Sequence, residues 1–311
     1  MKKLLGMTSL LALLIVAISA FEGQAFLSLG NMHNLLQRVG MMGIFAMGAG
    51  IVIMSGGIDL SIGSVMAFIG IVVALLAGDH WNPWLAAALV VPGCTLLGLW
   101  HAFVIDRFKL QPFLATLTTL LLLRGLARGI SGGQAVHLKG FGVLGNDSWL
   151  WIPIPFWILI GIALVLGFLM NFTVYGRYLY AIGRNEDAVR YSGIKVNRIR
   201  MLAYAISAVL AGIAGVVELS YVSEVQPASA ALMYEMWGIA AAVLGGCSLR
   251  GGEGSVLGVI VGVSLITVMH NGINLLGVNT EWEFAVIGVV ILGGVIADAA
   301  YKLRAAKRVK A

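Results

Sequence analysis

The segment Ser55–Ser64, which reads SGGIDLSIGS, places a carboxylate and three hydroxyl groups between two long apolar runs. Gly56 and Gly57 are expected to interrupt a helix, because glycine adopts non-helical backbone conformations easily. Asp59 can accept hydrogen bonds from the backbone N–H groups that such a break frees, and Ser61 can cap the helix that follows. Two interpretations fit this pattern: a purely structural cap, or a discontinuous helix whose polar backbone faces a solute path.

Two amides, those of Asn271 and Asn274, form a second candidate site. Their spacing of three residues puts them on one face of a helix. Amides placed there can bind the hydroxyl groups of a solute, and they can equally bond a neighbouring helix, as polar residues in membranes commonly do. The spacing leaves both alternatives open.

Catalytic motifs are not found in the sequence. The glycine-rich turn at 245–254, GGCSLRGGEG, lacks the G-x-x-x-x-G-K-[ST] spacing of a phosphate-binding loop. The five histidines show no metal-ligand spacing, and no G-x-S-x-G motif occurs. Cys94 and Cys247 lie in or beside apolar segments and indicate neither a disulfide framework nor a metal site. We therefore expect no catalytic residues, no metal and no cofactor bound by this chain.

The composition indicates the elements that must position these groups. Hydrophobic residues make up 60% of the 311 residues, charged residues 11%, and the mean hydropathy is +0.97. Soluble domains have about 25% charged residues, so this is a multi-pass membrane protein in contact with lipid. The net charge of +6 is not gathered into a soluble domain, which argues against nucleic acid as a partner.

Ten apolar segments predict an all-α protein of about ten transmembrane helices, some of them broken or short. The expected spans are 4–20, 34–54, 62–77, 85–105, 112–129, 152–172, 201–220, 236–246, 255–276 and 284–300. The first resembles a signal peptide, but an uncleaved span keeps the topology even. The eighth is too short to cross a hydrocarbon core of roughly 30 Å alone. We expect one transmembrane domain over residues 1–311.

The longest polar interruption is Thr173–Arg200. It contains two acids and six basic residues, which are Arg177, Arg184, Arg190, Lys195, Arg198 and Arg200. Basic loops between spans stay on the cytoplasmic side, so this loop and both chain termini are predicted to be cytoplasmic.

A short helix is expected inside this loop. Asn185 can cap its first turn, Glu186 and Asp187 place negative charge at its positive end, and Arg190 and Gly193 suit its C-terminal end. A helix of about two turns is marginal in water, since isolated helices shorter than roughly 12 residues seldom form. It is either part of a solvated loop or a docking helix for a cytoplasmic partner.

Four separated motifs carry a resemblance that extends from about residue 30 to 300. They are SGGIDLSIGS, GRYLYAIGRNEDAVRYSGI, QPASAALMYEMWGIAAAVLGGCSLRGGEG and HNGINLLGV. In this order and spacing they resemble the permease subunits of bacterial ABC importers for monosaccharides, of the ribose and xylose type. The branched-chain amino acid permeases are similar more distantly, without the IDLS turn. One departure is Trp237, where such permeases often have an acid, so no polar role is carried over to that position.

The resemblance implies partners and roles. It implies a pair of permease subunits, identical or different, a periplasmic sugar-binding protein, and a cytoplasmic ATPase that alone binds ATP. It makes Gly183–Gly193 the coupling segment seated on the ATPase, with Glu186, Asp187 and Arg190 as its polar contacts. The functional interpretations of the polar break and of the two amides predict a solute path that includes the residues Ser55, Gly56, Gly57, Asp59, Ser61, Asn271 and Asn274.

The function expected from sequence is thus a non-catalytic translocation subunit in the bacterial inner membrane. The alternatives are an ion-coupled carrier in which an intramembrane acid such as Asp59 exchanges a proton, and an ABC permease for another small solute such as a branched-chain amino acid. An intramembrane enzyme is disfavoured, because no nucleophile is paired with a base.

Overall fold

A computed structural model describes residues 2–78 and 81–277, together with the single positions 282, 285, 288, 289, 292 and 293. Within this part of the chain the fold is all-α apart from four strands of two residues each. Of the expected tenth span at 284–300 only the single positions named above are described, and the basic tail after it lies outside the residues described.

Nine of the expected spans coincide with helices. These are α1 (Lys2–Phe26), α2 (Leu29–Met54), α3 (Ile62–Gly78), α4 (Pro83–Phe108), α5 (Pro112–Ile130), α7 (Ile154–Phe172), α10 (Val196–Val222), α11 (Tyr234–Leu244) and α12 (Val256–Leu275). Over the described residues, seven helices are long and apolar enough to cross a membrane, while α3 and α11 are apolar but shorter. The sequence predicted a short eighth span, and α11 has 11 residues.

Three short helices and two small sheets complete the described fold. The helices are α6 (Val143–Asn146), α8 (Val174–Arg184) and α9 (Glu186–Tyr191). Strand β1 (Val136–His137) pairs antiparallel with β4 (Glu224–Val225), and β2 (Ser148–Trp149) pairs antiparallel with β3 (Ile152–Pro153).

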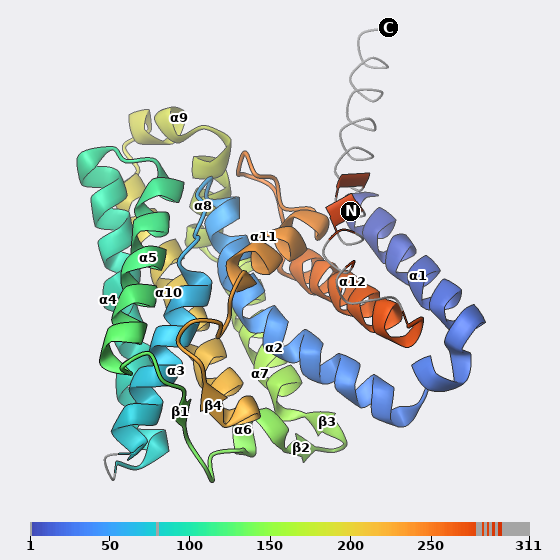
Figure 1. Ribbon diagram of the computed structural model, residues 1–311. Helices are drawn as coiled ribbons and strands as arrows, with labels where there is room; N and C mark the ends of the chain where they lie inside the picture. The colour runs from blue at the N-terminus through green and yellow to red at the C-terminus, as the bar shows by residue number, and fades with distance from the viewer. Residues whose placement is uncertain are drawn as a thin grey trace, which may run out of the picture.

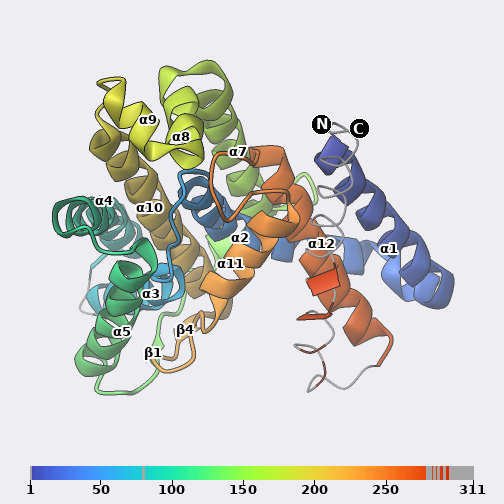
Figure 2. The ribbon, with the colours of Figure 1, turned by 90° about the horizontal axis from the view of Figure 1, so that it is seen from above.

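Helices α2 and α10 form the centre of the molecule. In the most apolar window of each, 78% and 72% of the residues are buried, against 6% in α1, 22% in α7 and 28% in both α4 and α5. Seen from above, α1 and α12 lie on one side of α2, and α4 and α5 lie on the other (Figure 2). Close packing needs small residues: a Cβ at Gly98 of α4 would overlap the backbone of Ala205 in α10.

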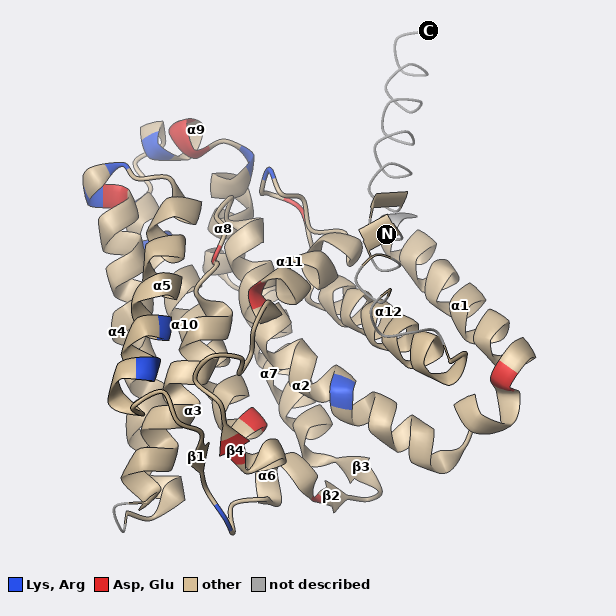
Figure 3. Cartoon of the chain, in the orientation of Figure 1, with Lys and Arg blue, Asp and Glu red and all other residues tan. Residues whose placement is uncertain are grey.

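The connections gather at two opposite ends (Figure 1). One end carries α9, and charged residues concentrate around it (Figure 3). The C-terminal end of α4 and the turn 245–255 meet α8 and α9 there, through contacts described below. The opposite end carries α6 and the two small sheets. Helix α1 lies at the edge and packs Ile18 and Phe26 against Leu35 of α2 and Val268 of α12.

Candidate functional site

The polar break at 55–61 is held by hydrogen bonds to the helices around it. Gly56 has a φ of +85°, and the side chain of Asp59 is 1% exposed. One carboxylate oxygen of Asp59 accepts from the backbone N–H of Ser61 at 3.0 Å and from its hydroxyl at 2.6 Å. The other accepts from the Ser207 hydroxyl of α10 at 2.8 Å. Asp59 therefore bonds the freed backbone, as the structural interpretation requires, and ties the break to the central helix.

Thr116 of α5 completes this anchor, and sequence reasoning missed it. Its hydroxyl oxygen accepts from the backbone N–H of Leu60 at 3.0 Å and lies 3.2 Å from the carbonyl oxygen of Ile58. Helix α5 thus binds backbone groups of the break, and α10 binds the Asp59 carboxylate within it. The break does not line the two cavities described below. Its place on a solute path stays a prediction.

The two asparagines of α12 have different surroundings. Asn271 and Asn31, at the start of α2, donate to each other at 2.6 and 3.0 Å. This matches the alternative in which an amide bonds a neighbouring helix. Asn274 is exposed and donates to the carbonyl oxygen of His270 at 2.9 Å, within its own helix.

The short helix predicted in the basic loop is confirmed as α9. The side chain of Asn185 accepts from the backbone N–H of Ala188 at 3.0 Å, which makes it the N-cap. Gly193 has a φ of +78°, in the left-handed region that glycine adopts without strain. Asp187 and Arg190 are exposed, and Tyr191 is 91% exposed.

A four-residue charge network attaches α9 to the helix bundle. Glu186 pairs with Arg190 one turn later at 2.5 Å, and its second carboxylate oxygen accepts from Arg200 at the start of α10. Arg200 also pairs with Asp106, which is 7% exposed near the end of α4. Sequence reasoning assigned Glu186 to an external partner and did not include Arg200 and Asp106 among the site residues. The ion pairs of Arg200 with Asp106 and Glu186 join different helices, so no regular spacing along the sequence indicates them.

Burial and the two neighbouring arginines have opposite effects on the pKa of the Glu186 carboxyl group. Burial raises this pKa, but the hydrogen bonds and charges of Arg190 and Arg200 outweigh burial, so the pKa lies below its usual value. A carboxylate with a lowered folded-state pKa contributes stability above its unfolded-state pKa and loses it as the pH falls through the folded value. The attachment of α9 is therefore intact at neutral pH.

Helix α8 packs closely against the break after α2 and against the turn 245–255, because glycines lie at the points of contact. We call Gly56, Gly183, Gly251 and Gly252 the glycine junction. The backbone N–H of Gly252 donates to the carbonyl oxygen of Met54, the last residue of α2, at 2.9 Å. A Cβ at Gly183 would overlap both the Gly252 nitrogen and that carbonyl oxygen. The segment expected to contact the ATPase is therefore packed directly on the end of α2 and on the turn before α12.

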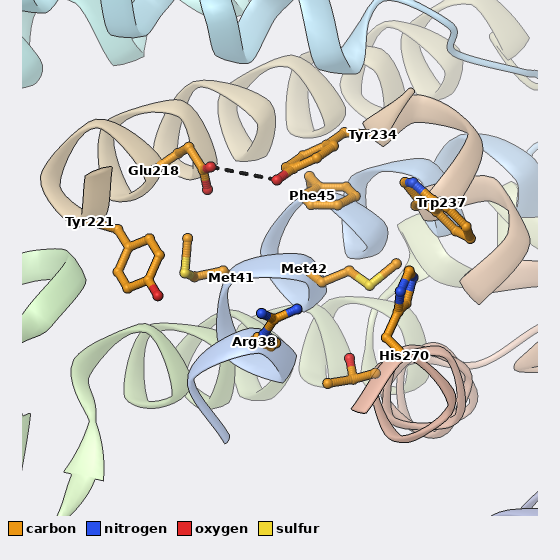
Figure 4. A pocket seen from close by; sticks show the side chains of 10 residues that line it. Arg38, Met41, Met42, Phe45, Glu218, Tyr221, Tyr234, Trp237 and His270 are labelled. Carbon is orange, nitrogen blue, oxygen red and sulfur yellow. Dashed lines mark hydrogen bonds between the residues drawn. The ribbon is translucent and has the colours of Figure 1, made fainter. Parts of the chain in front are cut away.

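A cavity of about 290 Å³ lies among α2, α10, α11 and α12, and we call it the central cavity. Figure 4 shows the side chains that reach it from these helices. Its lining residues are Arg38, Met41, Met42, Phe45, Glu218, Tyr221, Tyr234, Trp237, Thr267 and His270. None of these residues was predicted from the sequence to line a solute path, although Arg38 is a basic residue inside an apolar span, which signals a functional position.

Aromatic rings form much of the cavity wall. The rings of Phe45 and Tyr234 stack with centroids 5.3 Å apart, and those of Trp237 and His270 meet edge to face at 5.0 Å. Trp237, at the position where the sequence departs from the family pattern, thus contributes an aromatic surface.

Comparison with known proteins identifies relatives across nearly the whole chain. The family model described as the permease component of branched-chain amino acid transport systems matches residues 31–295. The ribose import permease protein of Escherichia coli (strain K12) is 37% identical over 302 residues, 95% of this chain and 94% of the relative. The L-arabinose transport system permease protein of the same strain is 34% identical over 306 residues, 98% and 92% of the two chains.

The name of a third relative specifies galactose, a hexose. The galactose/methyl galactoside import permease protein of Escherichia coli (strain K12) is 32% identical over 310 residues, covering 92% of this chain and 91% of the relative. No solved structure matches the chain significantly.

Proposed function

The chain belongs to the family of permease components of branched-chain amino acid transport systems, and from this premise we infer that it is the translocation subunit of an ATP-driven importer for a monosaccharide. The observation that carries the sugar assignment is that three relatives, each at least 32% identical over at least 91% of both chains, are permeases for ribose, arabinose and galactose. The chain is a multi-pass protein of the bacterial inner membrane.

The proposed topology has ten crossings with both termini in the cytoplasm. Three observations support it: Arg107 lies in the last turn of α4 beside Asp106, the basic loop holds α9, and Arg250 lies in the turn that packs on Gly183. The structure therefore brings three connections with basic residues to one end of the bundle. Such an end faces the cytoplasm under the positive-inside rule.

The partners follow from this orientation. Helix α9 presents Asp187, Arg190 and Tyr191 to a cytoplasmic ATPase, which alone binds and hydrolyses ATP. Glu186 holds α9 in place through Arg200, so we assign it to attachment rather than to the contact itself. A periplasmic sugar-binding protein would dock at the opposite end, and a second permease subunit, identical or similar, would complete the path.

Reconstitution tests this function. We expect proteoliposomes that contain the permease, its ATPase and its binding protein to accumulate ribose, arabinose or galactose only when ATP is supplied. Radiolabelled uptake measures this, with the ATPase omitted as the control. Uptake driven by a proton gradient without the ATPase would instead show an ion-coupled carrier. Uptake of leucine but none of the sugars would show an amino acid permease.

Labelling tests the orientation. A cysteine at Ala188, exposed on α9, should react with an impermeant maleimide in inside-out vesicles and not in intact cells. The matched control is Gln134→Cys, which is exposed on the connection between α5 and β1 and should show the reverse pattern. Labelling of the position-188 cysteine from outside would contradict both the topology and the ATPase contact.

A further inference from the structure

Two opposite charges line the central cavity without pairing with each other. Arg38 is exposed, and within the described part of the chain it forms no ion pair or hydrogen bond. Arg38 lies in α2, whose apolar window is 78% buried. A guanidinium that faced hydrocarbon there would be costly, so this side of α2 must face water or protein.

Glu218 reaches the cavity from α10 with most of its capacity for hydrogen bonds unused. Among the described residues it accepts one hydrogen bond, from the Tyr234 hydroxyl at 3.5 Å, which is at the long limit for such a bond. A carboxylate that is partly enclosed by protein needs donors, because leaving it unsatisfied is unfavourable. A ligand with hydroxyl groups supplies them, and its oxygen atoms also accept from Arg38.

The rest of the wall suits the apolar faces of a small sugar ring. Trp237 and Tyr234 present aromatic surface, and Thr267 adds a hydroxyl. A pocket of mostly apolar surface with a few placed polar groups is the usual form of a small-molecule site. The volume of about 290 Å³ is at the lower end of the range of about 300–1,000 Å³ seen for such sites, which fits a single monosaccharide.

A second cavity, of about 370 Å³, shares a wall with the first. Glu218 and Tyr234 line both cavities, and the second extends under the connection from Glu224 to Leu232. That connection contains β4 and belongs to the end opposite α9. A solute arriving from that end therefore meets the Glu218–Tyr234 pair on its way to the central cavity.

We propose that the central cavity is a monosaccharide subsite, in which Arg38 and Glu218 bind sugar hydroxyls and Trp237 packs against the sugar ring. The proposal rests on the proposed function and adds the place where this chain itself holds the substrate. The zwitterion of a branched-chain amino acid could also bridge Arg38 and Glu218. The sugar is favoured because the three relatives described above are sugar permeases.

Charge-neutral variants test the subsite in the complete transporter. In proteoliposomes with the ATPase and loaded binding protein, Glu218→Gln and Arg38→Gln should each lower sugar uptake roughly tenfold, the usual effect of losing one charged hydrogen bond. ATP hydrolysis stimulated by the binding protein should stay within about twofold, because α9 is untouched. The matched controls are Asp147→Asn and Arg128→Gln, exposed residues that line neither cavity, and should keep wild-type uptake.

Protection of a cysteine gives a readout that does not depend on transport. In the assembled permease, maleimide modification of a Met41→Cys variant should be slowed by ribose, arabinose or galactose at millimolar concentration and not by leucine. Modification of the Gln134→Cys control should be insensitive to all four.

The outcomes separate this inference from the proposed function. The subsite alone would be overturned if the wild type takes up sugar, the Glu218 and Arg38 variants take it up equally well, and sugar does not protect the Met41→Cys variant. Protection by leucine and not by the sugars would overturn the ligand class. Absence of ATP-driven sugar uptake in the wild type would overturn the proposed function, and the subsite with it.

Discussion

Replacement of Arg200 with alanine is expected to abolish ATP-driven uptake. Arg200 links α9 to α4 through its two ion pairs, while the buried Val189 of α9 also packs against Val196 of α10. Loss of Arg200 leaves Asp106, whose side chain is 4% exposed, without its cation. Removal of one partner of a buried ion pair typically costs about 3–5 kcal/mol. It also leaves Glu186 bound only by the exposed Arg190, a pair worth about 0.3–0.5 kcal/mol.

A double variant distinguishes loss of folding from loss of coupling. Arg200→Gln combined with Asp106→Asn removes both charges of the buried pair, so thermal stability in detergent should recover towards wild type. Uptake should remain low while the ATPase still hydrolyses ATP, because the ionic link from α9 to α4 is still missing. Arg198→Ala, an exposed basic residue of α10 outside the charge network, is the matched control and should keep wild-type uptake. Wild-type uptake in the Arg200→Ala variant would show that the network does not transmit movement from α9.

Replacement of Gly183 with alanine should uncouple ATP hydrolysis from sugar uptake, with an effect almost as large as that of Arg200→Ala. The added Cβ meets backbone atoms of Gly252 and Met54, which cannot rotate away as a side chain could. Either the hydrogen bond from Gly252 to Met54 breaks or α8 moves off the glycine junction. Overpacking typically costs about 1–3 kcal/mol. We expect sugar uptake to fall roughly tenfold, with ATP hydrolysis no longer stimulated by the loaded binding protein.

The control for this prediction is Gly161→Ala. Gly161 is also inside a helix, α7, but a Cβ there meets nothing within 4 Å. The substitution should leave uptake unchanged and stabilise the helix by up to about 1 kcal/mol. Equal effects of the two substitutions, measured as uptake and as melting temperature in detergent, would contradict a special role for the glycine junction.

The helices were predictable because their signal is local. An apolar run long enough to span a bilayer must become a helix, since lipid offers no partner for its backbone groups, and nine of the expected spans are helices in the described residues. The N-cap of α9 was predictable for the same reason. Asn185 and Ala188 are three residues apart, and the bond between them needs nothing from the rest of the chain.

The partners of these local elements were not predictable. Asp59 could be recognised as a group that binds freed backbone, but Ser207, which holds its second oxygen, is 148 residues away. Glu186 was assigned to an external contact because its sequence neighbourhood shows only an exposed helix, whereas the fold turns it towards Arg200. The central cavity is assembled from four helices, each of which contributes only a few of its residues.

The sequence by itself determined the membrane class, the helical segments and the resemblance to sugar permeases, and it predicts a cytoplasmic basic loop. Hydropathy and charge act on each segment separately, so these properties can be read along the chain. Only the tertiary structure decided which charges neutralise one another, where glycines allow backbones to touch, and that Arg38 and Glu218 line one cavity without pairing with each other. These depend on the packing of helices that are distant in sequence, and side chains more than about two turns apart on one chain meet only when the whole bundle has formed.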